Sequence, residues 1–197
     1  MDKGKFIVIE GLDLSGKDTQ IDLLKRYLSK TNDKVAVVSN VSSSPIGKTI
    51  RTLLSTPELY ISSRQMACIF ISELHIVAKD IERLLVEGFT VICSRWFYST
   101  LAYAGKERTV YNSIKEMSKV CVEPDIVIFL DITPDIALSR LNSRGTESDV
   151  YENIDKLTSV YNMYKTVIEE YKNKFIVIDA NQPFDKVHKD IITTLEI

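Results

Sequence analysis

The chain has little of what marks secreted, membrane-spanning or nucleic-acid-binding proteins. Its three cysteines, Cys68, Cys93 and Cys121, are widely spaced, so they form no metal-ligand pairs and cannot all pair with one another. No apolar run is long enough to cross a bilayer, and no signal-like segment precedes the first apolar stretch. A net charge of −2 does not favour a nucleic-acid-binding surface. We therefore expect a cytoplasmic protein with no membrane or nucleic-acid partner.

The chain also lacks internal repeats, low-complexity tracts and any stretch that resembles an interdomain linker. Its 197 residues are enough to form one domain with a sizeable core. A hydrophobic share of 45% and a charged share of 26% are ordinary for a globular protein. The composition therefore predicts one domain that spans residues 1–197.

What the chain does have is a regular alternation of apolar strands and amphipathic helices. Short apolar runs predict five strands, at residues 6–9, 35–38, 90–93, 125–130 and 175–178. Helical patterns begin at Lys17 and recur at residues 47–54, 63–87, 98–120 (as one helix or two), 134–141, 151–172 and 184–195. Continuous apolar strands separated by helices indicate a parallel sheet that is covered on both faces. In such sheets, ligands bind at the carboxyl ends of the strands.

The stretch GLDLSGKDT, residues 11–19, connects the first predicted strand to the first helix. A glycine-rich turn in this context predicts a phosphate-binding P-loop. Gly11 and Gly16 allow the backbone to bend so that successive N–H groups converge on a phosphate. The N-terminus of the helix adds the positive end of its dipole, and Lys17 adds a point charge for the outer phosphates.

With this P-loop, the first part of the chain resembles the thymidylate kinases, a family of P-loop nucleoside monophosphate kinases. Further segments agree with the family in order and spacing, at residues 45–51 (PIG and IR), 94–103 (SRWFYS and AY), 124–131 (PDIVIFLD), 137–145 and 177–180 (VIDA). The resemblance covers essentially the whole chain. It implies a three-layer α/β P-loop NTPase fold in which helices flank a five-stranded parallel sheet. It also implies a lid at about residues 140–152, within which the polar residues 142–148 predict a mobile segment.

The resemblance implies transfer of the γ-phosphoryl group of ATP to dTMP, which gives dTDP and ADP for dTTP synthesis. It also implies Mg²⁺ as cofactor and a homodimer as the assembly. Lys17 would hold the ATP phosphates, and Arg95 would contact the acceptor phosphate or the phosphoryl group in transfer. The lid arginines Arg140 and Arg144 would approach ATP. The implied ATP-binding residues are Gly11, Asp13, Leu14, Ser15, Gly16, Lys17, Asp18 and Thr19.

On the acceptor side, the resemblance implies that Arg51 binds the phosphate of the nucleoside monophosphate and that Phe70 stacks on its base. Phe70 also fits an ordinary core position, and Arg51, like the lid arginines, also fits a solvated surface. Trp96 either lines the acceptor site or fills the core beside it. The full set of implied substrate-binding residues is Glu10, Arg51, Phe70, Arg95, Ser99 and Tyr103.

Two departures from the family concern the metal and the P-loop. The family's hydroxyl after the P-loop lysine is Asp18 here, and its carboxylate before Arg95 is Ser94. We expect a compensated exchange, in which Asp18 binds Mg²⁺ and Ser94 binds its water shell. The alternative is that both positions have drifted and the site has lost activity. Leu14 replaces an arginine that some relatives use in catalysis, and we expect the lid to take over that task.

A third departure concerns the base. The family's thymine-reading arginine, one helical turn after Phe70, has no match among residues 72–75. Ser72 and His75 are polar candidates to replace it. The family's glutamine after AY is Ala104, and its lid Asp-Arg pair is Asp149-Val150. Two alternatives therefore stay open: a deoxynucleoside monophosphate kinase of different or relaxed base specificity, or a nucleotide-binding protein without kinase activity.

Overall fold

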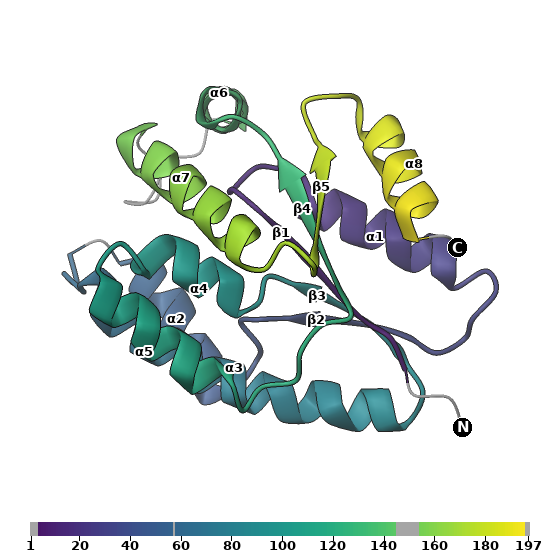
Figure 1. The fold of residues 1–197 in the computed structure, drawn as a ribbon, viewed down its shortest axis with the longest axis horizontal. Coiled ribbons are helices and arrows are strands. Elements are labelled where there is room, and N and C mark those ends of the chain that lie inside the picture. The colour runs from purple at the N-terminus through teal and green to yellow at the C-terminus, as the bar shows by residue number, and fades with distance from the viewer. Residues whose placement is uncertain (1–3, 57, 145–153, 196–197) are drawn as a thin grey trace.

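The centre of the fold is a five-stranded parallel sheet (Figure 1). A computed structural model describes residues 4–56, 58–144 and 154–195 of the chain. The strands lie in the order β2, β3, β1, β4, β5. Their bounds are Phe6–Gly11 (β1), Val35–Ser39 (β2), Thr90–Ser94 (β3), Ile126–Asp131 (β4) and Phe175–Asp179 (β5). The predicted α/β class and all five predicted strands are confirmed.

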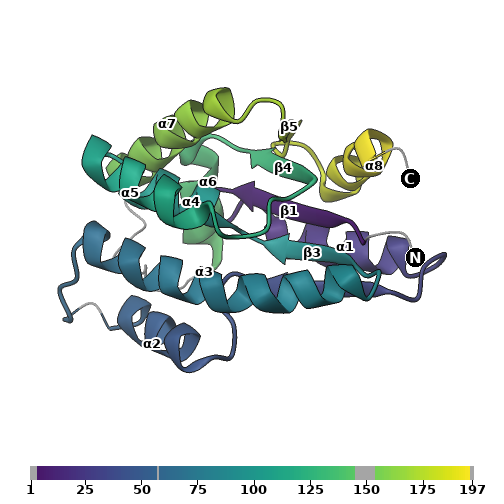
Figure 2. The same ribbon diagram turned by 60° about the horizontal axis from the view of Figure 1, so that its bottom comes forward.

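Helices cover both faces of this sheet (Figures 1 and 2). One face carries α1 (Lys17–Leu28) and α8 (Phe184–Leu195), and the other carries α3 (Ser63–Val86), α4 (Phe97–Ala104) and α7 (Ile154–Glu170). Three more helices pack against this second layer, namely α2 (Pro45–Leu54), α5 (Arg108–Ser118) and α6 (Pro134–Arg144). Within the described ranges, no helix is both long enough and apolar enough to cross a membrane.

Burial follows the position of each strand in the sheet. All six residues of β1 are buried because β3 and β4 flank it and helices cover both of its faces. The outer strands are less covered: Val37 in β2 and Val177 in β5 are 42% and 49% exposed. The prediction of two covered faces therefore holds best for the central strands.

The helix ends agree with the local sequence at most positions. Ser62 and Gln65 form a capping box at the start of α3, and Gly88, just past its end, adopts the left-handed conformation at φ 82° that glycine tolerates. The predicted helical stretch 98–120 is two helices, α4 and α5. One boundary prediction was wrong: residues 142–144, expected to be loop, continue α6. The rest of that predicted loop, residues 145–148, lies outside the described residues.

Candidate active site

The predicted P-loop connects β1 to α1 in a turn that requires glycine at its start. A Cβ on Gly11 would lie 2.6 Å from Ser15 Oγ and 2.9 Å from the Leu130 carbonyl oxygen, and the residue has φ 150°. Gly16 caps α1 at φ 94°, also in the range that glycine tolerates. Leu14 adopts φ 64°, which for a non-glycine residue costs on the order of 1–3 kcal/mol. The surrounding structure must therefore hold this turn in place.

Lys17 folds back into the concave side of this turn. Its side chain is buried, and Nζ donates to the carbonyl oxygens of Leu12 at 2.6 Å and Gly11 at 3.2 Å. Burial lowers the pKa of Lys17, the nearby charge of Arg95 lowers it further, and Asp13 partly opposes both, so that the pKa is about 7. The loop therefore holds an amine whose protonated form an anionic phosphate would stabilise.

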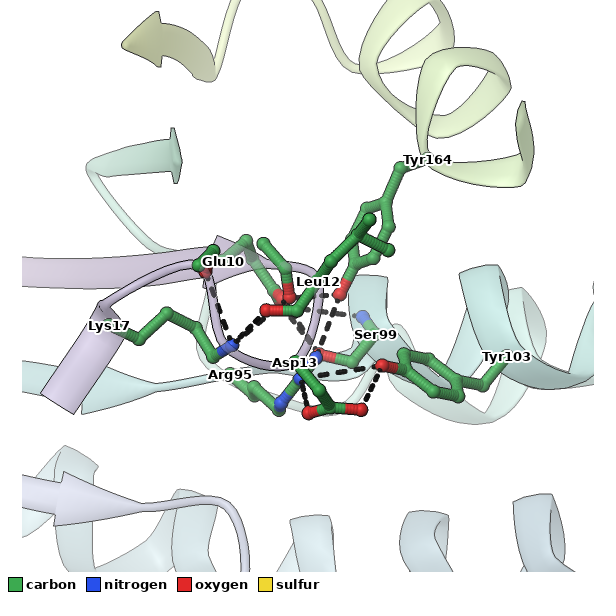
Figure 3. A network of polar contacts seen from close by, with 10 residues as sticks. Glu10, Leu12, Asp13, Lys17, Arg95, Ser99, Tyr103 and Tyr164 are labelled. Atoms are coloured by element: carbon green, nitrogen blue, oxygen red, sulfur yellow. Dashed lines mark hydrogen bonds and ion pairs between the residues drawn. The ribbon is translucent and has the colours of Figure 1, made fainter. Parts of the chain in front are cut away.

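Arg95 joins the end of β3 to the P-loop (Figure 3). Its backbone has φ 65°, a strained conformation of the kind that clusters at functional sites. Nη2 donates to Asp13 Oδ1 at 2.5 Å, and Nη1 donates to the Tyr164 hydroxyl at 3.1 Å. The guanidinium also lies over the Tyr103 ring, 5.3 Å from its centroid. These partners fix a cation at the boundary between the P-loop and the acceptor side.

Asp13 is the P-loop carboxylate that meets this cation. Burial alone would raise its pKa, but Arg95, Lys17 and a hydrogen bond from the Tyr103 hydroxyl at 2.7 Å outweigh that effect and lower the pKa to about 2. Asp13 therefore carries a negative charge at neutral pH, and this charge balances part of the positive charge of the site.

Glu10 lies beneath these residues with no accessible surface. Oε1 accepts a hydrogen bond from the Trp96 backbone N–H at 2.8 Å, and Oε2 accepts from the Tyr164 hydroxyl at 2.8 Å (Figure 3). Ser99 Oγ also lies 2.7 Å from Oε2. Glu10 was predicted to contact the substrate, but it does not line the cavity described next. The structure instead supports a positioning role, in which Glu10 holds α4 and α7 against β1.

A cavity of about 360 Å³ opens between the strand ends and helices α3 and α4. This volume is within the range typical of small-ligand sites. Six predicted site residues that are far apart in the sequence line it together: Asp13, Phe70, Ser94, Arg95, Ser99 and Tyr103. Because Asp13 belongs to the P-loop and Arg95 contacts it, the cavity directly adjoins the predicted phosphate site. Trp96 is fully buried and does not line the cavity, so it belongs to the core.

Arg51 lies next to the cavity but does not line it. It is exposed on α2, and its guanidinium donates to the carbonyl oxygens of Ser42 at 2.6 Å and Val41 at 3.2 Å. Val41 is part of the cavity lining. The structure therefore places Arg51 at the rim, one residue layer from the lining.

A functional residue that the sequence did not single out is Glu73 on α3. It has no accessible surface, its Oε1 accepts from the Ser42 backbone N–H at 2.8 Å, and its Oε2 accepts from the Ser44 hydroxyl at 2.5 Å. Ser44 in turn caps α2 by accepting from the Gly47 N–H. Glu73 thus holds the loop that positions Arg51. The available signal was its place in the apolar stripe of α3, where an ionisable residue needs a partner.

Other predicted ATP-side residues lie around the P-loop. Asp18 and Thr19 are exposed in the first turn of α1. Arg140 on α6 donates to the Leu14 carbonyl oxygen at 3.0 Å and to the Ala180 carbonyl oxygen at 3.0 Å, so it holds the P-loop backbone from the lid side. Arg144 is the last residue of α6. Its side chain, the remainder of the predicted lid at 145–152 and the Asp149-Val150 pair lie outside what the structure describes.

The two candidates to replace the base-reading arginine are not at the cavity. Ser72 is exposed and donates to the Cys68 carbonyl oxygen of its own helix at 2.9 Å. His75 Nε2 lies 2.8 Å from the Met117 carbonyl oxygen, outside the cavity lining. Neither residue lines the cavity, and both have protein partners, so the structure gives no support to a base-reading role for them. Leu74, the residue immediately before His75, is buried and apolar.

Comparison with known proteins decides the family. A family model described as thymidylate kinase matches residues 9–191. The chain belongs to the thymidylate kinase family. The thymidylate kinase of Caldicellulosiruptor saccharolyticus is 34% identical over 96% of both chains, and that of Thermoanaerobacter sp. (strain X514) is 31% identical over 98% of both chains.

The fold agrees with that assignment. A solved thymidylate kinase structure from Candida albicans superposes with a TM-score of 0.80 at 24% identity, covering 98% of this chain and 93% of that one. The chain is therefore a P-loop kinase of the thymidylate kinase family, whose members use ATP as the phosphate donor.

The role of Glu73 predicts a loss of stability when its carboxylate becomes an amide. In Glu73→Gln the new NH₂ group cannot accept from Ser42 N–H or the Ser44 hydroxyl, so we expect a loss of about 1–3 kcal/mol in the free energy of unfolding at pH 7. Urea titration followed by circular dichroism measures it. Glu82→Gln, an exposed change on the same helix, is the matched control and should cost less than about 0.5 kcal/mol.

The pH dependence of this loss tests its cause. Burial alone would raise the pKa of Glu73, but hydrogen bonds from Ser42 and Ser44 outweigh it and lower the pKa. A carboxyl group with a lowered folded-state pKa contributes stability above its unfolded pKa and loses it as the pH falls through the folded value. The difference in the free energy of unfolding between wild type and Glu73→Gln should therefore become smaller below about pH 4. A difference that stays constant down to pH 3 would contradict this assignment.

The low pKa of Lys17 predicts proton uptake when ATP binds. At pH 8 a group with a pKa of about 7 is mostly neutral, and the charge of ATP favours its protonated form, so uptake should approach about one proton per ATP. Calorimetry in buffers of different ionisation enthalpy measures it. Lys17→Arg, which does not titrate, should abolish the uptake. Equal uptake by wild type and Lys17→Arg would assign the proton to another group.

Proposed function

We propose that this chain transfers the γ-phosphoryl group of ATP to dTMP, giving ADP and dTDP, as one domain with the acceptor in the cavity described above. The observation that carries the proposal is the contact between Asp13 and Arg95. Both residues line the acceptor cavity, and Asp13 belongs to the P-loop. A donor bound at the P-loop and an acceptor bound in the cavity would therefore meet at Arg95, as in-line phosphoryl transfer requires.

Each side chain has a positioning or electrostatic task in this reaction. Lys17 exchanges its carbonyl partners for the outer phosphates of ATP, and the N–H groups of the turn bind the same phosphates. Arg95 stabilises the charge on the phosphoryl group in transfer. Arg51 binds the acceptor phosphate from the rim, and Phe70 stacks on the base. Little covalent chemistry falls to the protein, so these placements supply most of the catalysis.

Arg140 is suited to take over the task of the missing P-loop arginine. It donates to the carbonyl oxygen of Leu14, the position of the replacement. Its guanidinium therefore lies beside the turn that binds ATP. This placement supports a shared role for Arg140 and the lid residue Arg144 in contacting the donor.

Mg²⁺ is proposed as cofactor. Among the described residues, no group of three or more His, Cys, Asp or Glu side chains could enclose a metal. Asp18 and Ser94 offer only oxygen atoms as ligands. Such a small set suits Mg²⁺, because in kinases this ion keeps several waters and takes other oxygens from the substrate phosphates. Asp18 would hold the ion and Ser94 its water shell, and the bound ion would neutralise charge on the β- and γ-phosphates. We further propose a homodimeric, cytoplasmic enzyme on the basis of family membership.

Release of ADP in a coupled assay with ATP and Mg²⁺ tests the function. We expect turnover with dTMP, and a fall of at least about 100-fold in kcat for Lys17→Met, because the removed charge acts on the transferring phosphates. The exposed Lys119→Met should keep wild-type rates. Offering dUMP, dCMP, dAMP and dGMP separately measures base selectivity. Binding of ATP without turnover on any acceptor would overturn the enzyme assignment in favour of a nucleotide-binding protein.

The proposed exchange at the metal predicts non-additive variants. Asp18→Thr and Ser94→Asp should each reduce kcat by at least about tenfold, whereas the double variant should recover at least part of the loss, because it restores one hydroxyl and one carboxylate. Steady-state kinetics at several Mg²⁺ concentrations measures the effect. If the losses simply multiply in the double variant, the two positions do not compensate for each other.

A further inference from the structure

The acceptor cavity contains a buried amide that has no partner. Asn40 follows β2 and lines the cavity, yet it is 3% exposed. Its Oδ1 is buried and accepts no hydrogen bond. No hydrogen bond between described residues uses its Nδ2 either. A buried amide without partners is costly, so this residue requires an explanation.

The position of Asn40 separates it from other unsatisfied groups. Among the described residues, the buried side-chain atoms without a hydrogen-bond partner are Gln20 Oε1, Asn40 Oδ1, Asp131 Oδ1 and His188 Nδ1. Of these four residues, Asn40 alone lines the cavity. Its backbone N–H donates to the carbonyl oxygen of Ser94 at 3.3 Å, which fixes the residue beside the end of β3.

Three of the polar side chains on the cavity wall, those of Arg95, Ser99 and Tyr103, already have protein partners. Arg95 is bound to Asp13 and Tyr164, and the Tyr103 hydroxyl donates to Asp13. The Ser99 hydroxyl is bound to Glu10. The amide of Asn40 is therefore free to bind a ligand without breaking a contact within the protein.

The α3 wall beside Phe70 offers no donor of its own. Ser72 and His75 are bound elsewhere, and Leu74 is apolar. Glu73, the remaining residue of that turn, is committed to the loop before α2. A base stacked on Phe70 would therefore find its hydrogen-bond partner on another wall of the cavity.

We propose that Asn40 reads the base of the acceptor, its Oδ1 accepting from N3–H of thymine while Nδ2 donates to a neighbouring carbonyl oxygen. A carboxamide presents one acceptor next to one donor, the pattern that complements this edge of the base. This inference rests on the proposed function for the identity of the acceptor. It makes Asn40 a specificity residue that replaces the arginine missing from α3.

The proposal predicts opposite effects on stability and on binding. Asn40→Leu removes an unpartnered polar group from a buried position, so the Tm of the ligand-free chain should stay equal or rise. Binding of dTMP should weaken by about tenfold or more, because N3–H then lacks an acceptor. A residue with only a structural role would show the reverse, a lower Tm with little change in binding.

Calorimetry with dTMP and N3-methyl-dTMP tests the bond itself. The methyl group and Asn40→Leu remove the same hydrogen bond, so their penalties should not add. Wild type should prefer dTMP by about tenfold or more, and Asn40→Leu should bind both ligands within about twofold of each other. Gln20→Leu removes another buried amide, outside the cavity, and should keep the wild-type preference.

Each result has a distinct meaning. If Asn40→Leu still prefers dTMP over N3-methyl-dTMP, another residue reads N3–H. If the variant binds both ligands more weakly by the same factor, Asn40 contacts the sugar or the phosphate. Either result overturns this inference and leaves the proposed function standing. A wild type that turns over dTMP but binds N3-methyl-dTMP equally well also overturns this inference and leaves the proposed function standing. A wild type that neither binds nor phosphorylates dTMP overturns the proposed function together with this inference.

Discussion

A carboxylate with no access to water sets the geometry of this active site. Glu10 stands at the end of the central strand, and burial of its charge is tolerable only while donors from α4 and α7 reach both oxygens. One of those donors, Tyr164, also accepts a hydrogen bond from Arg95. The need to satisfy one buried charge therefore fixes where the Arg95 guanidinium lies.

Positive charge accumulates around this centre, and the fold stabilises it incompletely. The charge of Arg95 disfavours a proton on Lys17, while Asp13 offsets part of this repulsion. The turn uses its own carbonyl oxygens as partners for Lys17. Such a site gains more from a bound polyphosphate than a neutral one would, because the ligand supplies the charge that the protein lacks.

The cavity proposed for the acceptor, together with the loop beside it, shows the same division between satisfied and unsatisfied groups. Glu73 is buried and fully committed, so it holds α2 and the loop around Arg51. Asn40 is buried and uncommitted. Groups of the first kind contribute to the stability of the fold, whereas groups of the second kind reduce it and are available to a ligand. This contrast, more than the identity of any single residue, distinguishes the framework from the binding surface.

The sequence by itself determined the strands, most helix ends and the P-loop, because these depend on periodicity and on backbone conformations within a few residues. It also indicated Phe70, Arg95 and Tyr103, which the fold brings to one cavity. Only the tertiary structure decided the rest. Tyr164 meets Glu10 across 154 positions, and the directions of Ser72 and Asn40 depend on how helices and strands pack. Periodicity and turn residues do not specify which helices and strands pack against one another, so these contacts could not be predicted from the sequence.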